Sequence, residues 1–159
     1  MVTGTLGVIE ACIPALRRYA VSLLRDRQEV DDLVHDCILR ALDRLHTRQR
    51  DAEMRPWLFA ILHNLYVSRI RQGRARGRME PLDSISELAL TVSPRQEDQV
   101  VAQDIMQAVE RLPESLRTVL ILVTVEDLSY GEVSQVLNIP IGTVMSRLSR
   151  ARERIRQQS

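Results

Sequence analysis

Apolar residues recur at intervals of three and four along most of the chain, which is the pattern of amphipathic helices. In the N-terminal half this pattern predicts three helices, at about 8–24, 29–45 and 56–72. Pro14 interrupts the first and is expected to mark a helix start, whereas Pro56 fits the first position of the third. Residues 46–55 have no apolar period and predict a polar loop.

The C-terminal half begins with a break, since residues 73–93 combine Gly, Pro and Ser with weak periodicity and predict a linker. Helices are then expected at about 94–111, 113–125, from Ser129 to Asn138, and 144–156. Ser129 begins a capping box, and Asn138 can take the left-handed turn that ends the short helix. Thr143 is expected to cap the last helix.

No β-strand is needed anywhere, so the predicted fold class is all-α, with two small helical domains joined by a flexible linker. The expected boundaries are 1–76, a linker at 77–93, and 94–159. The last two short helices are separated by a tight turn that contains Gly142. This arrangement is typical of a helix-turn-helix.

The last helix has a profile that suits DNA. Four apolar residues fall within about 60° of one another on a helical projection and form a buried stripe: Val144, Leu148, Ala151 and Ile155. Small Ser residues and several Arg lie away from that stripe, where a backbone can approach a groove and guanidinium groups can reach bases and phosphates. The alternative is the basic surface helix of an ordinary bundle.

The net charge of +1 hides a strong division along the chain. All 22 basic residues are Arg. Residues 1–79 carry 14 Arg against 9 acids, residues 80–115 carry 2 against 8, and residues 116–159 carry 6 against 4. Five Arg lie in 69–78 and five more in 147–156. Codon bias explains the missing Lys but not this clustering, which favours a phosphate-bearing partner.

With 159 residues, of which 45% are hydrophobic and 3% aromatic, the chain is expected to bury an aliphatic core. Trp57 and Phe59 are expected in that core in preference to stacking on bases. Cys12 and Cys37 do not form a disulfide framework and are expected to be buried thiols, with a redox pair left open. The sequence contains no membrane span, metal-ligand motif or catalytic motif. It therefore predicts a cytoplasmic protein, not an enzyme, with no cofactor and no small-molecule substrate.

Long segments of the chain resemble extracytoplasmic-function (ECF) RNA polymerase sigma factors. Residues 137–155 (LNIPIGTVMSRLSRARERI) are similar to the family's region 4.2, and two segments before them resemble region 4.1: 111–122 (RLPESLRTVLIL) and 126–133 (EDLSYGEV). Region 2 is resembled by 17–20 (RRYA), 30–42 (VDDLVHDCILRAL) and 55–64 (RPWLFAILHN). The resemblance implies a promoter-specificity subunit that binds core RNA polymerase and promoter DNA, and it suggests an anti-sigma partner.

The resemblance also implies three sets of site residues. Polymerase would contact the second helix at Asp31, Asp32, His35, Asp36, Leu39 and Arg40, although the family usually has Gln-Glu where this chain has His35-Asp36. The −10 element would meet Asn64, Tyr66, Arg69, Arg71, Arg74 and Arg76. The −35 element would meet Met145, Ser146, Arg147, Ser149 and Arg150, with Thr143 on a phosphate or at the helix cap.

Two other functions are open to such a sequence. A sigma-like decoy would bind a regulator instead of DNA, but the Arg-rich last helix argues against it. An ordinary helix-turn-helix repressor would usually dimerise on a palindrome, and the two-domain layout argues against that.

The acidic linker between basic ends further predicts a free chain that is compact and binds promoter DNA poorly until polymerase separates its two lobes.

Overall fold

The computed structural model describes residues 2–47, 53–75 and 96–158. These residues form α-helices and one short 3₁₀ turn, and the described part of the chain contains no strand, so the all-α prediction is confirmed. The N-terminal half comprises α1 (Val2–Leu23), α2 (Arg27–Asp43), η1 (Leu45–Thr47) and α3 (Met54–Ala75). The C-terminal half comprises α5 (Gln96–Glu110), α6 (Glu114–Thr124), α7 (Tyr130–Leu137) and α8 (Ile141–Gln158).

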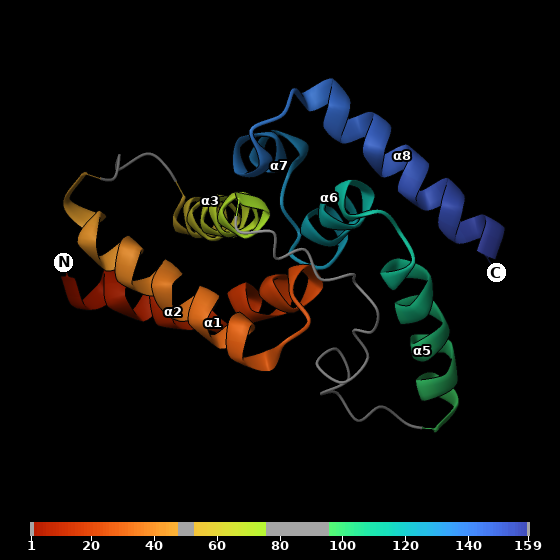
Figure 1. Cartoon of the computed structure of the whole chain (residues 1–159), viewed down its shortest axis with the longest axis horizontal. Coiled ribbons are helices and arrows are strands. Elements are labelled where there is room, and N and C mark those ends of the chain that lie inside the picture. Colours follow the sequence, from red (N-terminus) through yellow and green to blue (C-terminus); the bar gives the residue numbers. More distant parts are fainter. Residues whose placement is uncertain (1, 48–52, 76–95, 159) are drawn as a thin grey trace.

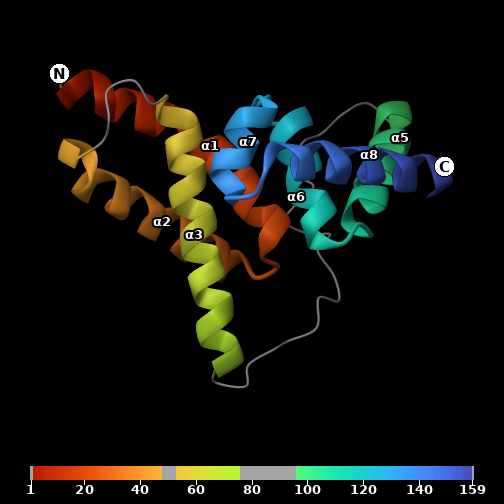
Figure 2. The same cartoon turned by 90° about the horizontal axis from the view of Figure 1, so that it is seen from above.

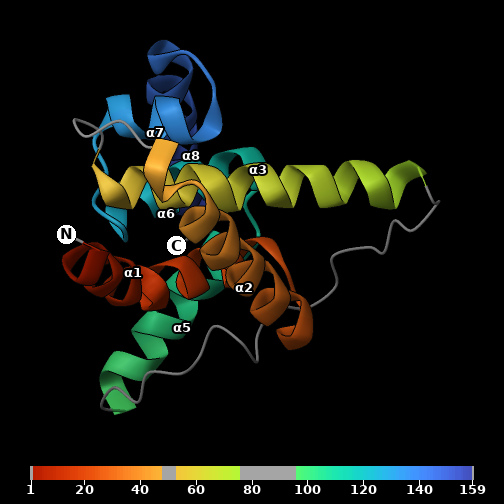
Figure 3. The same cartoon turned by 90° about the vertical axis from the view of Figure 1, so that its left-hand side faces the viewer.

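Helices α1, α2 and α3 pack on one another around an aliphatic core (Figure 1). Fully buried Leu16, Leu33 and Leu62 supply much of it, and the Tyr19 and Phe59 rings meet edge to face with centroids 5.6 Å apart. Phe59 is therefore a core residue, as expected, and Trp57 packs half-buried against the same core. The C-terminal turns of α3 extend beyond the other helices (Figure 3).

The expected start of the first helix at Pro14 is wrong, because Pro14 lies inside α1, which runs from residue 2. A proline in a helix interior removes the hydrogen bond to the carbonyl of residue i−4, here Glu10. Glu10 and Pro14 are both exposed, so water can reach that carbonyl. Burial of Ile9 and Cys12 on the opposite side of the helix offsets the lost bond.

The two ends of α7 are formed as predicted, but the start of α8 is not. The Ser129 side chain accepts a hydrogen bond from the Glu132 amide at 3.1 Å, Glu132 accepts one from the Ser129 amide at 2.8 Å, and Asn138 adopts φ 55°. The capping role expected for Thr143 is wrong. Helix α8 begins two residues earlier, and the Pro140 carbonyl accepts the amides of Thr143 and Val144 at 3.0 and 3.1 Å.

The two halves of the molecule pack directly against each other. Helix α7 lies on α3, and α6 lies on α1, as Figures 1 and 2 show from two directions. Polar contacts reinforce this packing: Tyr66 donates to Glu114, and the Arg117 guanidinium donates to the Ser22 carbonyl at 3.0 Å. Side chains of both halves therefore share one continuous core.

Candidate polymerase and nucleic-acid surfaces

Helix α8 presents the two faces that its sequence predicts. Val144, Leu148 and Ala151 are buried, and Ile155 is half-buried beside them. The predicted −35 residues Met145, Ser146, Ser149 and Arg150 are exposed, with Met145 at 53%, whereas Thr143 and Arg147 are half-buried. The exposed part of this set offers small hydroxyls and a guanidinium along one accessible helix face.

A shallow cavity of about 330 Å³ continues this surface. It is lined by Met145, Leu148, Ser149, Arg152 and Arg156 of α8, together with Tyr130 at the start of α7. Arg152 and Arg156 follow Ser149 at helical intervals, so the spacing alone could have grouped them with the −35 candidates.

The predicted −10 residues on α3 face in different directions. Asn64 and Arg71 are exposed and lie about 20° apart on the helix projection, so they share a face. Arg69 points toward α2 and pairs with Asp36. Tyr66 is only 4% exposed, and its hydroxyl contacts Glu114, so it is inaccessible to DNA while the halves are packed together.

Arg74 and Arg76 complete the set of −10 candidates. Arg74 belongs to the helix, but its side chain is not described, and Arg76 lies outside the described residues. Asn64 and Arg71 are therefore the members of this set that the structure brings together on an open surface.

The predicted polymerase residues on α2 also divide into groups. Asp32, His35 and Leu39 face outward, and Leu39 is 52% exposed. Asp31 lies on the flank that faces α1, where it pairs with Arg17. Asp36 and Arg40 lie on the flank that faces α3.

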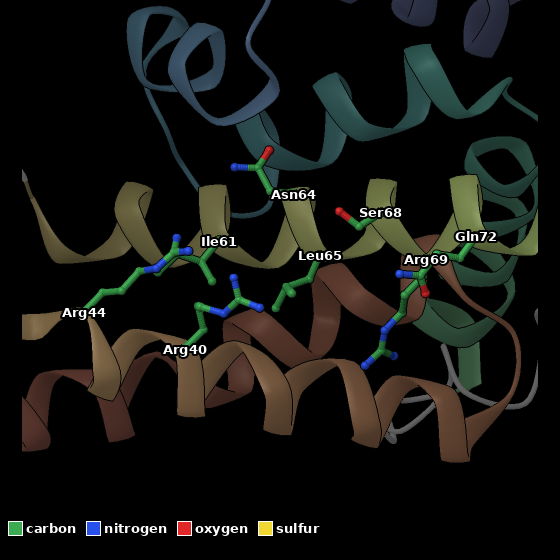
Figure 4. A pocket seen from close by; sticks show the side chains of 8 residues that line it. All are labelled: Arg40, Arg44, Ile61, Asn64, Leu65, Ser68, Arg69 and Gln72. Carbon is green, nitrogen blue, oxygen red and sulfur yellow. The ribbon is translucent and has the colours of Figure 1, made fainter.

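A groove separates α2 from α3 on that flank (Figure 4). It encloses about 340 Å³. The side chains that line it are Arg40 and Arg44 from α2 and Ile61, Asn64, Leu65, Ser68, Arg69 and Gln72 from α3.

Glu126, just before α7, is the most buried acid described, with 0% of its side chain exposed. Two guanidinium groups from the other half of the molecule hold it. Arg18 donates through Nη2 to Oε1 at 2.9 Å and through Nε to Oε2 at 3.2 Å, and Arg55 donates to Oε1 at 2.9 Å. Nothing in the sequence pattern singled out this contact, because its three residues are far apart along the chain.

The two cysteine thiols of the N-terminal core are weakly acidic. Burial raises the pKa of the Cys12 thiol, partly offset by Arg55, and raises the pKa of Cys37 to about 12. Thiols with such pKa values are poor nucleophiles. Both cysteines are free. In the described ranges, no group of three His, Cys, Asp or Glu is placed to hold a metal ion.

These surfaces define a class: an all-α, helix-turn-helix protein with an Arg-bearing recognition helix joined to a second, three-helix unit. Residues 102–155 match the family "Sigma-70, region 4", and residues 9–63 match "Sigma2 domain of PhyR". No helix within the described ranges combines the length and apolar character needed to cross a membrane.

Three known proteins illustrate the likeness. The ECF RNA polymerase sigma factor EcfG of Rhodopseudomonas palustris is 33% identical over 147 residues, which cover 92% of this chain and 80% of that protein. SigW of Bacillus subtilis, another ECF sigma factor, is 29% identical over 86% of this chain and 78% of its own length. The sigma factor RpoE of Bartonella quintana, solved in complex with the anti-sigma factor NepR, superposes with a TM-score of 0.79 at 28% identity and covers 96% of this chain and 94% of that one.

The chain belongs to the ECF RNA polymerase sigma factors. It is an alternative sigma factor that directs transcription initiation.

Proposed function

We propose that this chain binds core RNA polymerase through the outward face of α2 and reads a promoter with two helices, α3 at the −10 element and α8 at the −35 element. The observation that carries the proposal is the Arg-bearing, solvent-facing side of α8 combined in one chain with an α2 whose outer face is acidic and apolar. A stand-alone repressor has no need of the second surface.

At the −35 element, the exposed hydroxyls of Ser146 and Ser149 allow the α8 backbone to approach the bases closely. Arg150 then reaches a base or phosphate from the same face. An Arg fork bonds guanine through O6 and N7, and such a pair contributes about 1–3 kcal/mol of discrimination against the wrong base. Met145 offers an apolar contact to a thymine methyl group.

At the −10 element, Asn64 and Arg71 of α3 form the first contact, and Arg69, Arg74 and Arg76 are further candidates for contacts with DNA phosphates. Tyr66 joins this set only when α6 moves away from α3. We assign polymerase docking to Asp32, His35 and Leu39, with Asp31, Asp36 and Arg40 at the edges of that surface. Asp31 and Asp36 each pair there with an Arg of a neighbouring helix.

The corresponding domain limits are 1–76 for the polymerase and −10 unit, 77–93 for the linker and 94–159 for the −35 unit. In this function the chain works in the cytoplasm beside the polymerase, and the chemistry of RNA synthesis belongs to its partner. It acts without catalysis, cofactor, membrane insertion or small-molecule substrate of its own.

A second partner is an anti-sigma factor that clamps the packed halves. The solved relative with 28% identity was crystallised with the anti-sigma factor NepR, and the present fold superposes on it over almost the whole chain. The closed packing of α3 on α7 and of α1 on α6 is a surface that such a partner can recognise.

Run-off transcription with purified core polymerase tests the main proposal. Templates come from promoters mapped by sequencing transcripts after overexpression of the chain. The chain should give promoter-dependent transcripts, and the double variant Arg147→Ala/Arg150→Ala should lose most of them while it still binds the polymerase. A chain that binds DNA alone but never supports initiation would sink the sigma-factor proposal.

A further inference from the structure

The turn between α7 and α8 decides the direction in which the proposed −35 helix leaves its neighbour. Figure 1 shows the two helices joined by this short connection. The residues that separate the helices are Asn138, Ile139 and Pro140. The predicted −35 residues begin at Thr143, inside the first turn of α8. A small change in this connection therefore moves the side chains that are proposed to meet the −35 element.

Two of these three residues restrict the backbone of the turn. Asn138 adopts the left-handed conformation, with φ 55° and ψ 51°. The ring of Pro140 fixes its own φ, and the residue before a proline is restricted to extended conformations. The ψ angle of Ile139 remains adjustable within that extended range. This angle sets where the Ile139 carbonyl points and, with it, the direction of α8.

Ser134 of α7 holds the Ile139 carbonyl. Its hydroxyl donates to that oxygen at 2.5 Å, while the Ser134 carbonyl accepts the Ile139 amide at 3.1 Å. The Ser134 carbonyl also accepts the Asn138 amide. Within the residues that the structure describes, no backbone amide donates to the Ile139 carbonyl, so the Ser134 hydroxyl is the group that orients it. The two bonds between Ser134 and Ile139 therefore fix both polar groups of the Ile139 backbone.

Packing reinforces this pair of residues. Ser134 and Ile139 are both half-buried, and the Ile139 side chain packs against the core. Partial burial limits the access of water, so a carbonyl that loses its donor there is not fully compensated. The Thr124 hydroxyl offers a comparison, because it donates to the Leu120 carbonyl at 2.6 Å within a single helix. The Thr124 bond leaves the direction of α8 unaffected, whereas the Ser134 bond joins α7 to the turn before α8.

We propose that Ser134 is a positioning residue for −35 recognition, because its hydroxyl fixes the angle at which α8 leaves α7. The side chain acts through the turn and does not itself touch DNA. Recognition requires side chains to be held within about 0.5 Å and about 10–20° of the productive arrangement. The buried stripe of α8 holds this helix on the core, and Ser134 fixes the end that carries Met145 and Ser146. The inference rests on the proposed function, since it concerns the same −35 surface.

The main test compares variants as complexes of the full chain with core polymerase. One fluorescent promoter duplex carries a mapped −35 element, a second carries that element scrambled, and anisotropy gives both affinities. The ratio of the two affinities isolates −35 recognition, because the −10 contacts are the same on both duplexes. Ser134→Ala should lower this ratio about fivefold, which is the low end of what one good base contact contributes. Its affinity for the scrambled duplex should equal that of the wild-type chain.

Two control variants separate the loss of this hydroxyl from a general loss of structure. Ser134→Thr keeps the hydroxyl and should retain the wild-type ratio. Thr124→Ala removes a hydroxyl–carbonyl bond inside α6 and should retain the ratio too. Because Ala is a better helix former than Ser, α7 should persist in Ser134→Ala. A wild-type ratio in Ser134→Ala, or an equal loss in either control, would overturn the proposal.

A distance measurement on the free chain tests the turn without DNA. Spin labels can be attached to Gln135→Cys of α7 and Gln157→Cys of α8, because both positions are exposed and the native thiols are buried. Pulsed dipolar spectroscopy should give a narrow distance distribution when Ser134 is intact and a broader or shifted one with Ser134→Ala. An unchanged distribution would also overturn the proposal.

The two arms distinguish a failure of this inference from a failure of the proposed function. A wild-type complex that binds both duplexes equally would contradict the proposed −35 function, and the spin-label distances would still decide whether Ser134 fixes the turn. A wild-type complex that prefers the mapped −35 element, matched by Ser134→Ala, would contradict only the role of Ser134.

Discussion

Glu126 is the side chain on which the polar contact between the two halves is centred. Its carboxylate is fully buried, while the side chains of Arg18 and Arg55 that hold it are 53% and 39% exposed. Water therefore stabilises the two cations even without the carboxylate, whereas the carboxylate depends on them. The Arg55 guanidinium also lies 5.8 Å from the centre of the Phe59 ring, which ties this contact to the N-terminal core.

Replacement Glu126→Gln keeps the shape of the side chain and removes its charge. We expect the free energy of unfolding to fall by about 1.5–3 kcal/mol, because hydrogen bonds to charged groups contribute about that much. Urea unfolding measures it. Glu153→Gln, at the exposed pair with Arg156, is the control and should change stability by less than about 1 kcal/mol. Equal effects in the two variants would contradict a special role for Glu126.

His63 gives a second prediction at this scale. Burial lowers its pKa below the ordinary value of 6.5, although Glu114 opposes the shift, and its Nδ1 lies 3.0 Å from the Tyr19 hydroxyl. The unfolded chain therefore binds more protons than the folded chain once the pH drops to about 6.5. Stability should fall as the pH decreases through and below that value.

Urea unfolding between pH 5 and 7.5 checks this expectation. The difference between wild type and His63→Gln should shrink on acidification, because the variant lacks the titrating ring. His35→Gln, at an exposed position on α2, should follow the wild-type pH dependence. A pH dependence that is identical in all three proteins would contradict the assignment to His63.

At the scale of elements, local chemistry predicts where most helices lie and fails where tertiary packing competes with it. The capping box and the left-handed Asn138 were predictable because each depends on neighbouring residues. The prediction that a helix starts at Pro14 failed because the burial of Ile9 and Cys12 against other helices offsets the backbone hydrogen bond that Pro14 removes. The prediction of a cap at Thr143 failed because Pro140 already supplies the carbonyl that begins α8.

Short helices depend strongly on their caps, and α7 has only eight residues. Ser129→Ala should lower the free energy of unfolding by about 1 kcal/mol. It should also weaken −35 DNA binding, because α7 supports α8 through their packing. Ser115→Ala, at an exposed position in α6, should leave both measurements unchanged. If Ser129→Ala is as stable as the wild-type chain, the capping box at the start of α7 does not contribute to stability.

At the scale of the whole molecule, the sequence predicted the buried stripe of α8 but not which helices of the two halves would meet. The periodicity of α3 does not reveal that Tyr66 packs beneath α6, because a 3.6-residue pattern identifies a buried face without its partner. The same limit applies to α2: the family resemblance groups Arg40 with the acids of that helix, and only the fold shows that Arg40 lies on the flank that faces α3.

The packed halves predict a compact free chain. Scattering should give a radius of gyration near 15 Å, the value of about 2.2·N^0.38 Å for a folded chain of this length. Donor and acceptor dyes can be attached to Glu10→Cys and Gln157→Cys, because the two native thiols are buried and unreactive. The two dyes should move apart when core polymerase is added and separates the halves. An already extended free chain, or unchanged energy transfer with polymerase, would contradict this arrangement.

The Glu126 contact has a consequence for competition between partners. If the closed population exceeds the open one a hundredfold, a partner that needs the open form binds about a hundredfold more weakly than its intrinsic affinity, whereas one that recognises the closed form loses nothing. Each 1.4 kcal/mol held between Glu126 and its two arginines would shift this handicap tenfold. A few side chains remote from every DNA contact would thus set how much polymerase is needed to displace an inhibitor.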